Sequence, residues 1–404
     1  MTPDSTKSDS ETSPSGPRRY QMLDVWRGLV CLVVVLEHVG VVLWPFDSPQ
    51  AAGWDGWLRG WLVSGLTWNF GSPLFFVMSG YCIASSLDSS RRRGDSPGRF
   101  LYRRFWRIYP TYWAALLAFV GFVVAADAFG LGVLHRNAVS LEVVSPAELD
   151  ASQWLGNLTL TETWRPHLGG SPYASVFTRV AWSLCYQEQF YLICVLAFWL
   201  APGRLDWMLA GATVVIAAFR LAAQDAGSFH YLEGTFPVYW HVFAVGLAVY
   251  WRLNLASGSP AWARRSVELG LAVLASEGVI QGKVAMTAPF LFGLLLIVMR
   301  RWDAAATGLV WLAPVRACGR RSFSIYLIHL PMTMVGNAAL VGVGLESFWV
   351  RALVILPAVT VASVALGWAF HHVIEKHFLG QPPALRGGAH SLLSFGGRLL
   401  VRPA

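Results

Sequence analysis

The first long apolar stretch of the chain, residues 22–43, carries four ionisable side chains that hydrocarbon disfavours: Asp24, Arg27, Glu37 and His38. Such groups are costly inside a membrane span, and by default they mark a pathway or a functional site. Arg27 and His38 are eleven residues apart, and an α-helix turns by about 100° and rises by about 1.5 Å per residue. The spacing predicts that both side chains lie on one helix face, about 16 Å apart, with Arg27 near a membrane surface and His38 near the midplane.

The chain as a whole is too apolar for a soluble domain. Its 404 residues are 55% hydrophobic and only 13% charged, and the mean hydropathy is +0.48. Repeated apolar stretches approach the roughly 20 residues that a helix needs to cross a bilayer. The sequence therefore predicts an all-α polytopic integral membrane protein with about ten transmembrane helices, at residues 22–43, 61–84, 107–128, 180–200, 206–223, 236–252, 266–281, 285–300, 322–343 and 349–372.

The distribution of positive charge predicts the orientation. An even number of spans places both termini on one side, and most Lys and Arg residues fall in cytoplasmic segments if that side is the cytoplasm. The positive-inside rule therefore favours cytoplasmic termini. The net charge of +8 arises from short basic clusters between apolar spans, so we expect a lipid bilayer and no nucleic acid as partner. The five cysteines show no metal-ligand spacing, and no metal site is expected.

The polar ends of the chain set the predicted domain limits. Residues 1–19 are rich in Ser, Thr and Pro, as is typical of a disordered tail, and residues 379–404 form a short cytoplasmic C-terminal tail. No cleavable signal peptide is expected, because the first apolar stretch is long and contains charged groups. Residues 20–378 are predicted to form one transmembrane domain. Its long outer segment, 129–179, is expected to be either a lid or part of an acceptor site, or a membrane-interface loop with aromatic anchors.

Six motifs together resemble a known family. They are LDVWRG…LEHVG around Arg27 and His38, FFVMSGYCI (75–83), RRFWRIYPTYW (103–113), WSLCYQEQFYL (182–192), SFSIYLIHLP (322–331) and VIEKHF (373–378). Their content and order resemble acyltransferase family 3, the membrane O-acyltransferases that modify bacterial sugars and sugar-bearing metabolites. The resemblance implies a location in the inner membrane.

The resemblance also implies roles for the ionisable groups. His38 would act as the catalytic base or transient acyl carrier, since imidazole titrates near neutral pH; a lone buried histidine is otherwise more often structural. Arg104 and Arg107 match a paired-arginine motif and, with Arg27, would bind the nucleotide and pyrophosphate of acyl-CoA. The alternative for the arginine-rich inner loop, 91–107, is that it only follows the positive-inside rule.

Four further residues are candidates for a supporting or acceptor-side role. Asp24 lies one turn before Arg27 and either holds its guanidinium or complements the helix dipole. Glu37 points about 100° away from His38, so we do not expect it to orient the imidazole. Relatives often carry two consecutive acids where this chain has Gln187 and Glu188, so Glu188 retains the second position alone. His329 would orient the acceptor, line the cavity or pack against a neighbouring helix.

Two classes of function follow from these residues. The first is an acyltransferase that moves an acyl group, most simply acetyl, from acyl-CoA to a hydroxyl of a sugar or glycan. It would need no bound cofactor, and it would use either direct transfer or an acyl-histidine relay. The second is a proton-coupled transporter of a small metabolite. Transporters often contain inverted repeats or paired broken helices, and neither is evident in this sequence.

Overall fold

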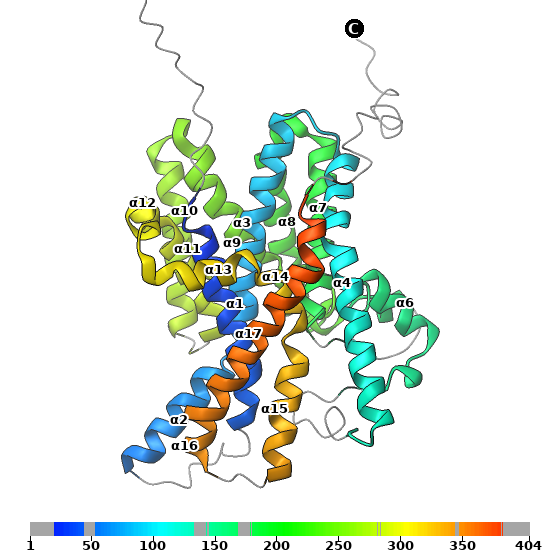
Figure 1. Cartoon of the computed structure of the whole chain (residues 1–404). Helices are drawn as coiled ribbons and strands as arrows, with labels where there is room; N and C mark the ends of the chain where they lie inside the picture. Colours follow the sequence, from blue (N-terminus) through cyan, green and yellow to red (C-terminus); the bar gives the residue numbers. More distant parts are fainter. Residues whose placement is uncertain are drawn as a thin grey trace, which may run out of the picture.

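The structure is a computed structural model, and it describes residues 20–43, 53–132, 143, 145–168, 178, 180–280, 282, 284–343, 347–380 and 382. Within these residues the fold is entirely helical (Figure 1). The α-helices are α1 (Leu23–Val39), α2 (Gly53–Thr67), α3 (Gly71–Arg92), α4 (Pro97–Ala128), α6 (Ala151–Thr159), α7 (Trp182–Leu200), α8 (Leu205–Asp225), α9 (Pro237–Tyr250), α10 (Ala261–Ile280), α11 (Val284–Met299), α12 (Asp303–Thr307), α13 (Ala313–Arg320), α14 (Ser322–Ile328), α15 (Leu330–Val343), α16 (Phe348–Val350) and α17 (Leu356–Val373).

Short helical segments connect or extend these helices. The 3₁₀ segments are η1 (Gly40–Leu43), η2 (Pro146–Glu148), η3 (Arg165–Leu168), η4 (Pro202–Arg204), η5 (Phe229–Leu232), η7 (Ala256–Gly258), η8 (Arg300–Trp302), η9 (Val310–Leu312) and η11 (Glu375–Phe378). Two segments, η6 (Trp251–Leu255) and η10 (Arg351–Ile355), are π-helical.

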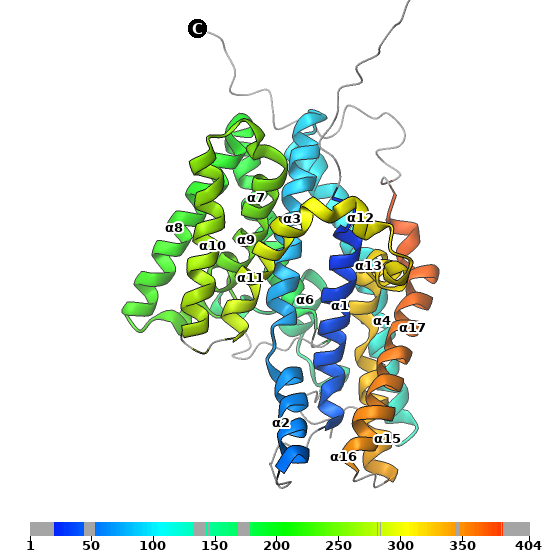
Figure 2. The ribbon, with the colours of Figure 1, turned by 90° about the vertical axis from the view of Figure 1, so that its left-hand side faces the viewer.

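The described helices fit a multi-pass membrane protein. Five of them are long and apolar enough to cross a bilayer, or six when the bent pair α14 and α15 counts as one span. This confirms the predicted class, whereas the number of ten spans stays a prediction. The start of α1 and the end of α17 lie toward the same end of the bundle (Figures 1 and 2), as an even number of passes requires. Which side of the membrane this end faces also stays a prediction.

Two of the predicted spans are interrupted. The predicted span 61–84 is divided between α2 and α3, and Asn69 in the break adopts a positive φ of 52°. The predicted span 322–343 bends by 43° between α14 and α15, at His329. Pro331 explains this bend, because proline lacks the N–H that would continue the helical hydrogen bonds. These interruptions were not evident in the sequence.

Helix α4 begins ten residues earlier than predicted, and most of the predicted arginine-rich loop is helical. Pro97 occupies the first turn, and the hydroxyl of Ser96 accepts a hydrogen bond from Arg99 N at 3.2 Å. A serine cap followed by proline is a strong helix start signal. Arg104 and Arg107 consequently lie well inside α4 rather than at its beginning.

Helix α1 occupies the middle of the bundle, between α3 on one side and α14 and α17 on the other (Figure 2). On the far side of α3, glycines let α3 and α9 approach closely. A Cβ atom on Gly246 would meet backbone atoms of Val77, Gly80 and Tyr81. Close backbone contact through small residues is a common way to join membrane helices.

The described part of the outer segment packs on the bundle. The hydroxyl of Tyr112 donates to the carbonyl of Asn157 at 2.8 Å, and the indole of Trp113 donates to that of Leu158 at 2.9 Å. His167 bonds the carbonyl of Glu233 in the turn before α9. These contacts fix α6 and η3 against α4 and α9, so this part of the segment forms a cover. Residues 169–177 of this segment lie outside the described residues.

Candidate active site

One face of α1 runs along α14. The guanidinium of Arg27 donates to the hydroxyl of Ser322 at 3.0 Å, and near the other end of α1 the ring of His38 contacts the ring of His329. Arg27 and His38 therefore share a helix face, as their spacing predicts. Asp24 lies 3.8 Å from Arg27, so it supports the guanidinium as a more distant second partner.

His38 forms a pair with His329 at the bend between α14 and α15. The ring centroids are 5.0 Å apart and the planes meet at 61°. Nδ1 of His38 lies 2.7 Å from the carbonyl oxygen of Val34. Because a carbonyl only accepts, Nδ1 carries the proton and Nε2 holds a free lone pair. That is the state a general base or nucleophile requires.

Glu37 does not orient His38, in agreement with the sequence expectation. Its carboxylate accepts hydrogen bonds from the backbone N–H groups of Phe70, at 2.9 Å, and Gly71, at 3.1 Å. These groups begin α3, where the local chain supplies no side-chain cap. Glu37, a residue of α1, thus caps the N-terminus of α3. Its negative charge also interacts favourably with the positive end of the α3 dipole. Its role is to join α1 and α3 next to His38.

Five of the seven arginines between residues 91 and 107 form ion pairs with two shared aspartates. Asp88 binds Arg91 and Arg92 at 3.2 and 2.6 Å; Asp95 binds Arg93, Arg99 and Arg103 at 3.0, 3.5 and 2.6 Å. Burial alone would raise the pKa of Asp95, but the hydrogen bonds and charges of Arg103 and Arg93 hold that pKa below its ordinary value. These five arginines are therefore structural.

The other two arginines, Arg104 and Arg107, form no ion pair within the described part of the chain. The guanidinium of Arg104 lies over the rings of Phe100 and Tyr191, at 5.6 and 5.4 Å from their centroids. Arg107 lies within range of the charges of Arg104 and Arg27. Three guanidiniums thus lie near one another, with Asp24 beside Arg27 and Glu188 on the crevice that Arg104 lines, and such a cluster attracts phosphate.

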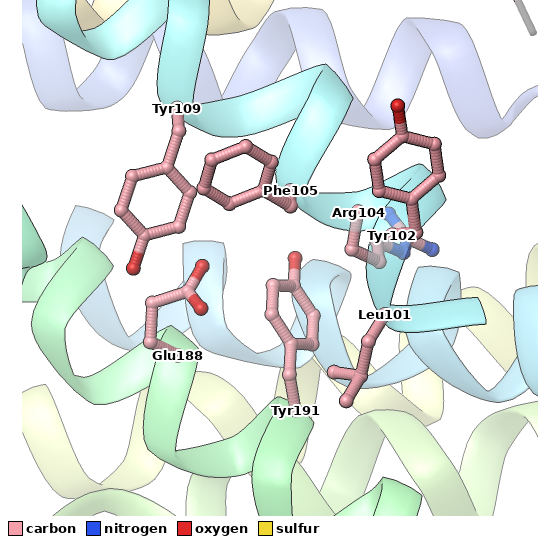
Figure 3. Close-up of a pocket in the computed structure, with 7 residues that line it drawn as sticks. All are labelled: Leu101, Tyr102, Arg104, Phe105, Tyr109, Glu188 and Tyr191. Carbon is pink, nitrogen blue, oxygen red and sulfur yellow. The ribbon is translucent and has the colours of Figure 1, made fainter. Parts of the chain in front are cut away.

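A crevice of about 330 Å³ opens between α4 and α7 beside this cluster. It is lined by Leu101, Tyr102, Arg104, Phe105, Tyr109, Glu188 and Tyr191 (Figure 3). The carboxylate of Glu188 points into it, toward the hydroxyls of Tyr109 and Tyr191 (Figure 3). The crevice therefore combines aromatic walls with a guanidinium and a carboxylate that do not form an ion pair with each other.

The residue before Glu188 turns to another helix. The amide of Gln187 is buried and donates to the hydroxyl of Ser79 on α3 at 2.9 Å. A second carboxylate in this place would face a hydroxyl rather than the crevice. The replacement of the first acid of the pair by Gln187 therefore leaves the crevice and its carboxylate intact.

The chain matches the family model described as an acyltransferase domain over residues 20–372. The chain belongs to acyltransferase family 3. This acyltransferase is 26% identical over 333 residues to BcsY of Komagataeibacter xylinus, provisionally named a membrane-bound transacylase, with 79% of this chain and 74% of the relative covered. It is 28% identical over 218 residues to protein 2 in the picA locus of Rhizobium radiobacter, with 53% of this chain and 99% of the relative covered. No solved structure matches it.

Sequence reasoning on the acyltransferase missed three parts of this site. Tyr109 and Tyr191 line the crevice. Tyr191 lies three residues after Glu188 on α7, which was a usable signal, whereas Tyr109 lies five residues after Arg104 on α4, a spacing that does not predict a shared face. Ser322, the closest partner of Arg27, carries no such signal, because the contact joins residues 295 positions apart. The contact between His38 and His329 is equally non-local, although both residues were candidates.

Proposed function

We propose that this acyltransferase moves an acyl group, most simply acetyl, from acyl-CoA to a hydroxyl of a sugar or glycan. The observation that carries the proposal is the Nε2 lone pair of His38, held on the same helix face as Arg27, which belongs to a cluster of three arginines. Family membership restricts the chemistry to acyl transfer. A base and a site for an anionic donor are the two parts that such a transfer needs.

The arginine cluster would bind the phosphates of the donor. Arg27, Arg104 and Arg107 offer planar guanidiniums suited to phosphate oxygens, while the other arginines nearby are occupied by aspartates. The crevice beside Arg104 would then receive part of the pantetheine arm. Glu188 can accept a hydrogen bond from a hydroxyl or amide N–H of this arm, and the aromatic walls of the crevice suit the methyl groups of the arm.

His38 would act through Nε2 in either of two ways. In direct transfer, Nε2 takes the proton of the acceptor hydroxyl as its oxygen attacks the thioester, and the proton then passes to the leaving thiolate. In the relay form, Nε2 first takes the acyl group and passes it to the acceptor. An acyl-histidine adduct at His38 after rapid quenching would identify the relay, whereas ternary-complex kinetics without an adduct would identify direct transfer.

Positive charge also supports an orientation in the inner membrane. The arginine-rich end of α3 and α4 lies at the same end of the bundle as the start of α1 and the end of α17 (Figures 1 and 2). We infer that this end faces the cytoplasm, where acyl-CoA is available, with both termini cytoplasmic. The glycan acceptor would then approach His38 from the opposite side.

The direct test is transfer of labelled acetyl from acetyl-CoA by the detergent-purified protein to a panel of sugars and glycans. Loss of general-base catalysis typically costs 10²- to 10⁴-fold, so we expect His38→Ala to lower the rate by at least about 10²-fold. A matched control is His372→Ala, since His372 is exposed and bonds only its own helix within the described residues. Equal rates in wild type and His38→Ala would refute the proposal.

The broken helices favour one alternative, a proton-coupled transporter with His38 and Glu37 in its pathway. Discontinuous spans that meet at mid-depth are common in transporters. The variant His38→Ala also separates the two functions. If the protein is a transporter, the wild type takes up its substrate into proteoliposomes without consuming thioester, and His38→Ala abolishes this uptake. Thioester consumption by the protein in detergent cannot come from transport.

A further inference from the structure

The two histidines of the pair present the same ring nitrogen. Nδ1 of His329 lies 2.8 Å from the carbonyl oxygen of Tyr326, so it carries a proton, as Nδ1 of His38 does toward Val34. Nε2 of His329 is fully buried and has no hydrogen-bond partner within the described residues. The ring centroids are 5.0 Å apart and no hydrogen bond joins the two Nε2 atoms, so the pair holds two lone pairs within contact distance of one shared proton rather than an existing hydrogen bond.

A single imidazole in this geometry has only one reactive nitrogen. The proton on Nδ1 of His38 is held by a carbonyl that cannot accept it, so Nε2 must serve every step. If Nε2 binds a proton, the resulting imidazolium is buried and needs a partner to be stable. If Nε2 binds an acyl group, another base must take the proton of the acceptor hydroxyl.

We propose that Nε2 of His329 is this second proton-accepting atom. In direct transfer, the O–H bond of the acceptor breaks and Nε2 of His38 binds the proton; the two rings then move from edge contact to hydrogen-bond distance, and the new N–H donates to Nε2 of His329 until the thiolate takes the proton. In the relay form, the C–S bond breaks as Nε2 of His38 takes the acyl group, and the thiolate takes a proton from water; the proton of the acceptor then goes to Nε2 of His329 as the C–N bond to His38 breaks, and it returns to water. No external oxidant, reductant or base is consumed in either form. The inference rests on the proposed function.

Among the residues that the structure describes around the pair, no other group is a competing base of the same kind. Tyr326 of α14 is in ring contact with His329, but its hydroxyl bonds Ser183 and the carbonyl of Val180. Helix α17 contributes the uncharged hydroxyl of Ser363. Glu37, adjacent to His38 on α1, is engaged by the backbone of α3. Each neighbouring polar group is occupied, and Nε2 of His329 is not.

The bend at His329 is what brings the ring to His38. It also offers the simplest competing account, in which the imidazole only fills space at the bend. The hydroxyl of Thr333 lies 3.4 Å from the carbonyl oxygen of His329 and is fully buried. Thr333→Val therefore alters packing at the bend without removing the imidazole, and it serves as the control.

The test compares His329→Phe, His329→Gln and Thr333→Val in the full-length detergent-purified protein. We expect His329→Phe to lower kcat by about 10²-fold with KM for both substrates unchanged. Without the acceptor for the imidazolium N–H, the acid limb of the kcat/KM profile should move to lower pH by about one unit, the size of one hydrogen bond to a charged group. His329→Gln keeps an acceptor oxygen, so part of the rate and of the shift should be recovered.

A second measurement does not depend on acyl transfer. Diethyl pyrocarbonate modifies unprotonated imidazole, so peptide mapping of modified His38 across pH reports its proton affinity in wild type and in His329→Phe. A lower midpoint in the variant supports the shared proton even if acetyl-CoA is not the donor. An unchanged midpoint, or equal losses of kcat in His329→Phe and Thr333→Val with unaltered pH profiles, would show a packing role and overturn the inference.

Discussion

Glu37 of α1 caps helix α3 at Gly71, which joins the helix that carries His38 to its central neighbour. The carboxylate lies 2.9 Å from the backbone nitrogen of Phe70 and 3.1 Å from that of Gly71. Glu37→Ala leaves both N–H groups without an acceptor, and an unsatisfied buried donor costs about 1–3 kcal/mol. We expect a lower Tm of the purified protein, measured by thermal unfolding in detergent, and a smaller decrease for Glu37→Gln.

Gly71 gives an independent check on the same contact. A Cβ atom on Gly71 would lie 2.5 Å from Oε2 of Glu37 and 2.9 Å from a methyl carbon of Val34. Gly71→Ala should therefore displace the carboxylate and reproduce the loss of Tm. Gly65→Ala is the control, since a Cβ atom on this residue of α2 meets nothing within 4 Å. Equal Tm values for both glycine variants would argue against the cap.

Arg107 and Arg103 lie four residues apart on α4 but have opposite environments. Arg103 is bound by Asp95 at 2.6 Å, whereas Arg107 lies near Arg104 and Arg27 without an ion pair among the described residues. We expect Arg107→Gln to raise KM for acyl-CoA about tenfold or more, the value of a charge-assisted hydrogen bond. Arg103→Gln should leave that KM unchanged, and an equal rise in both would mean that the arginines act only through net charge.

Asp95 predicts how stability responds to acid. Its pKa in the folded protein lies below the ordinary value, so its contribution is complete above the unfolded pKa of about 3.9 and is lost as the pH falls through the folded pKa. The difference in Tm between wild type and Asp95→Asn should therefore be constant above about pH 5 and shrink below about pH 4. A difference that grows with acidification would contradict this assignment.

The contact between α3 and α9 tolerates no added carbon. A Cβ atom on Gly246 would collide with backbone atoms of Val77, Gly80 and Tyr81, which cannot rotate away. Gly246→Ala should destabilise the protein by about 1–3 kcal/mol, as overpacking does. Gly121→Ala on α4, where nothing lies within 4 Å, should be neutral. Fluorescence-detected size exclusion after heating distinguishes the two variants.

Local periodicity accounts for what the sequence predicted well. The eleven-residue spacing of Arg27 and His38 is enough to place both on one face of α1, because helix geometry is fixed by the backbone alone. Hydropathy likewise suffices for the membrane class. The early start of α4 was also readable, since Ser96 and Pro97 form a helix start signal that was overlooked.

Non-local contacts account for the features that the sequence did not predict. Nothing in the run of arginines tells that Asp95 forms an ion pair with Arg103, while Arg107 has no ion pair among the residues that the structure describes, because that depends on how the turn between α3 and α4 is folded. The cap that Glu37 provides for α3 spans 33 positions of sequence. The approach of His329 to His38 depends on a bend of 43° that hydropathy cannot register.

Because Arg27, Arg104 and Arg107 lie close together, an anion bound among them would stabilise the folded protein. Like charges held together in a medium of low permittivity repel one another, and a ligand that binds only the folded protein adds about 1.4 kcal/mol to its stability for each tenfold excess over Kd. The empty acyltransferase is then its most fragile form. We expect its lifetime in the cell to follow the supply of its donor, so that starvation for the substrate also depletes the enzyme.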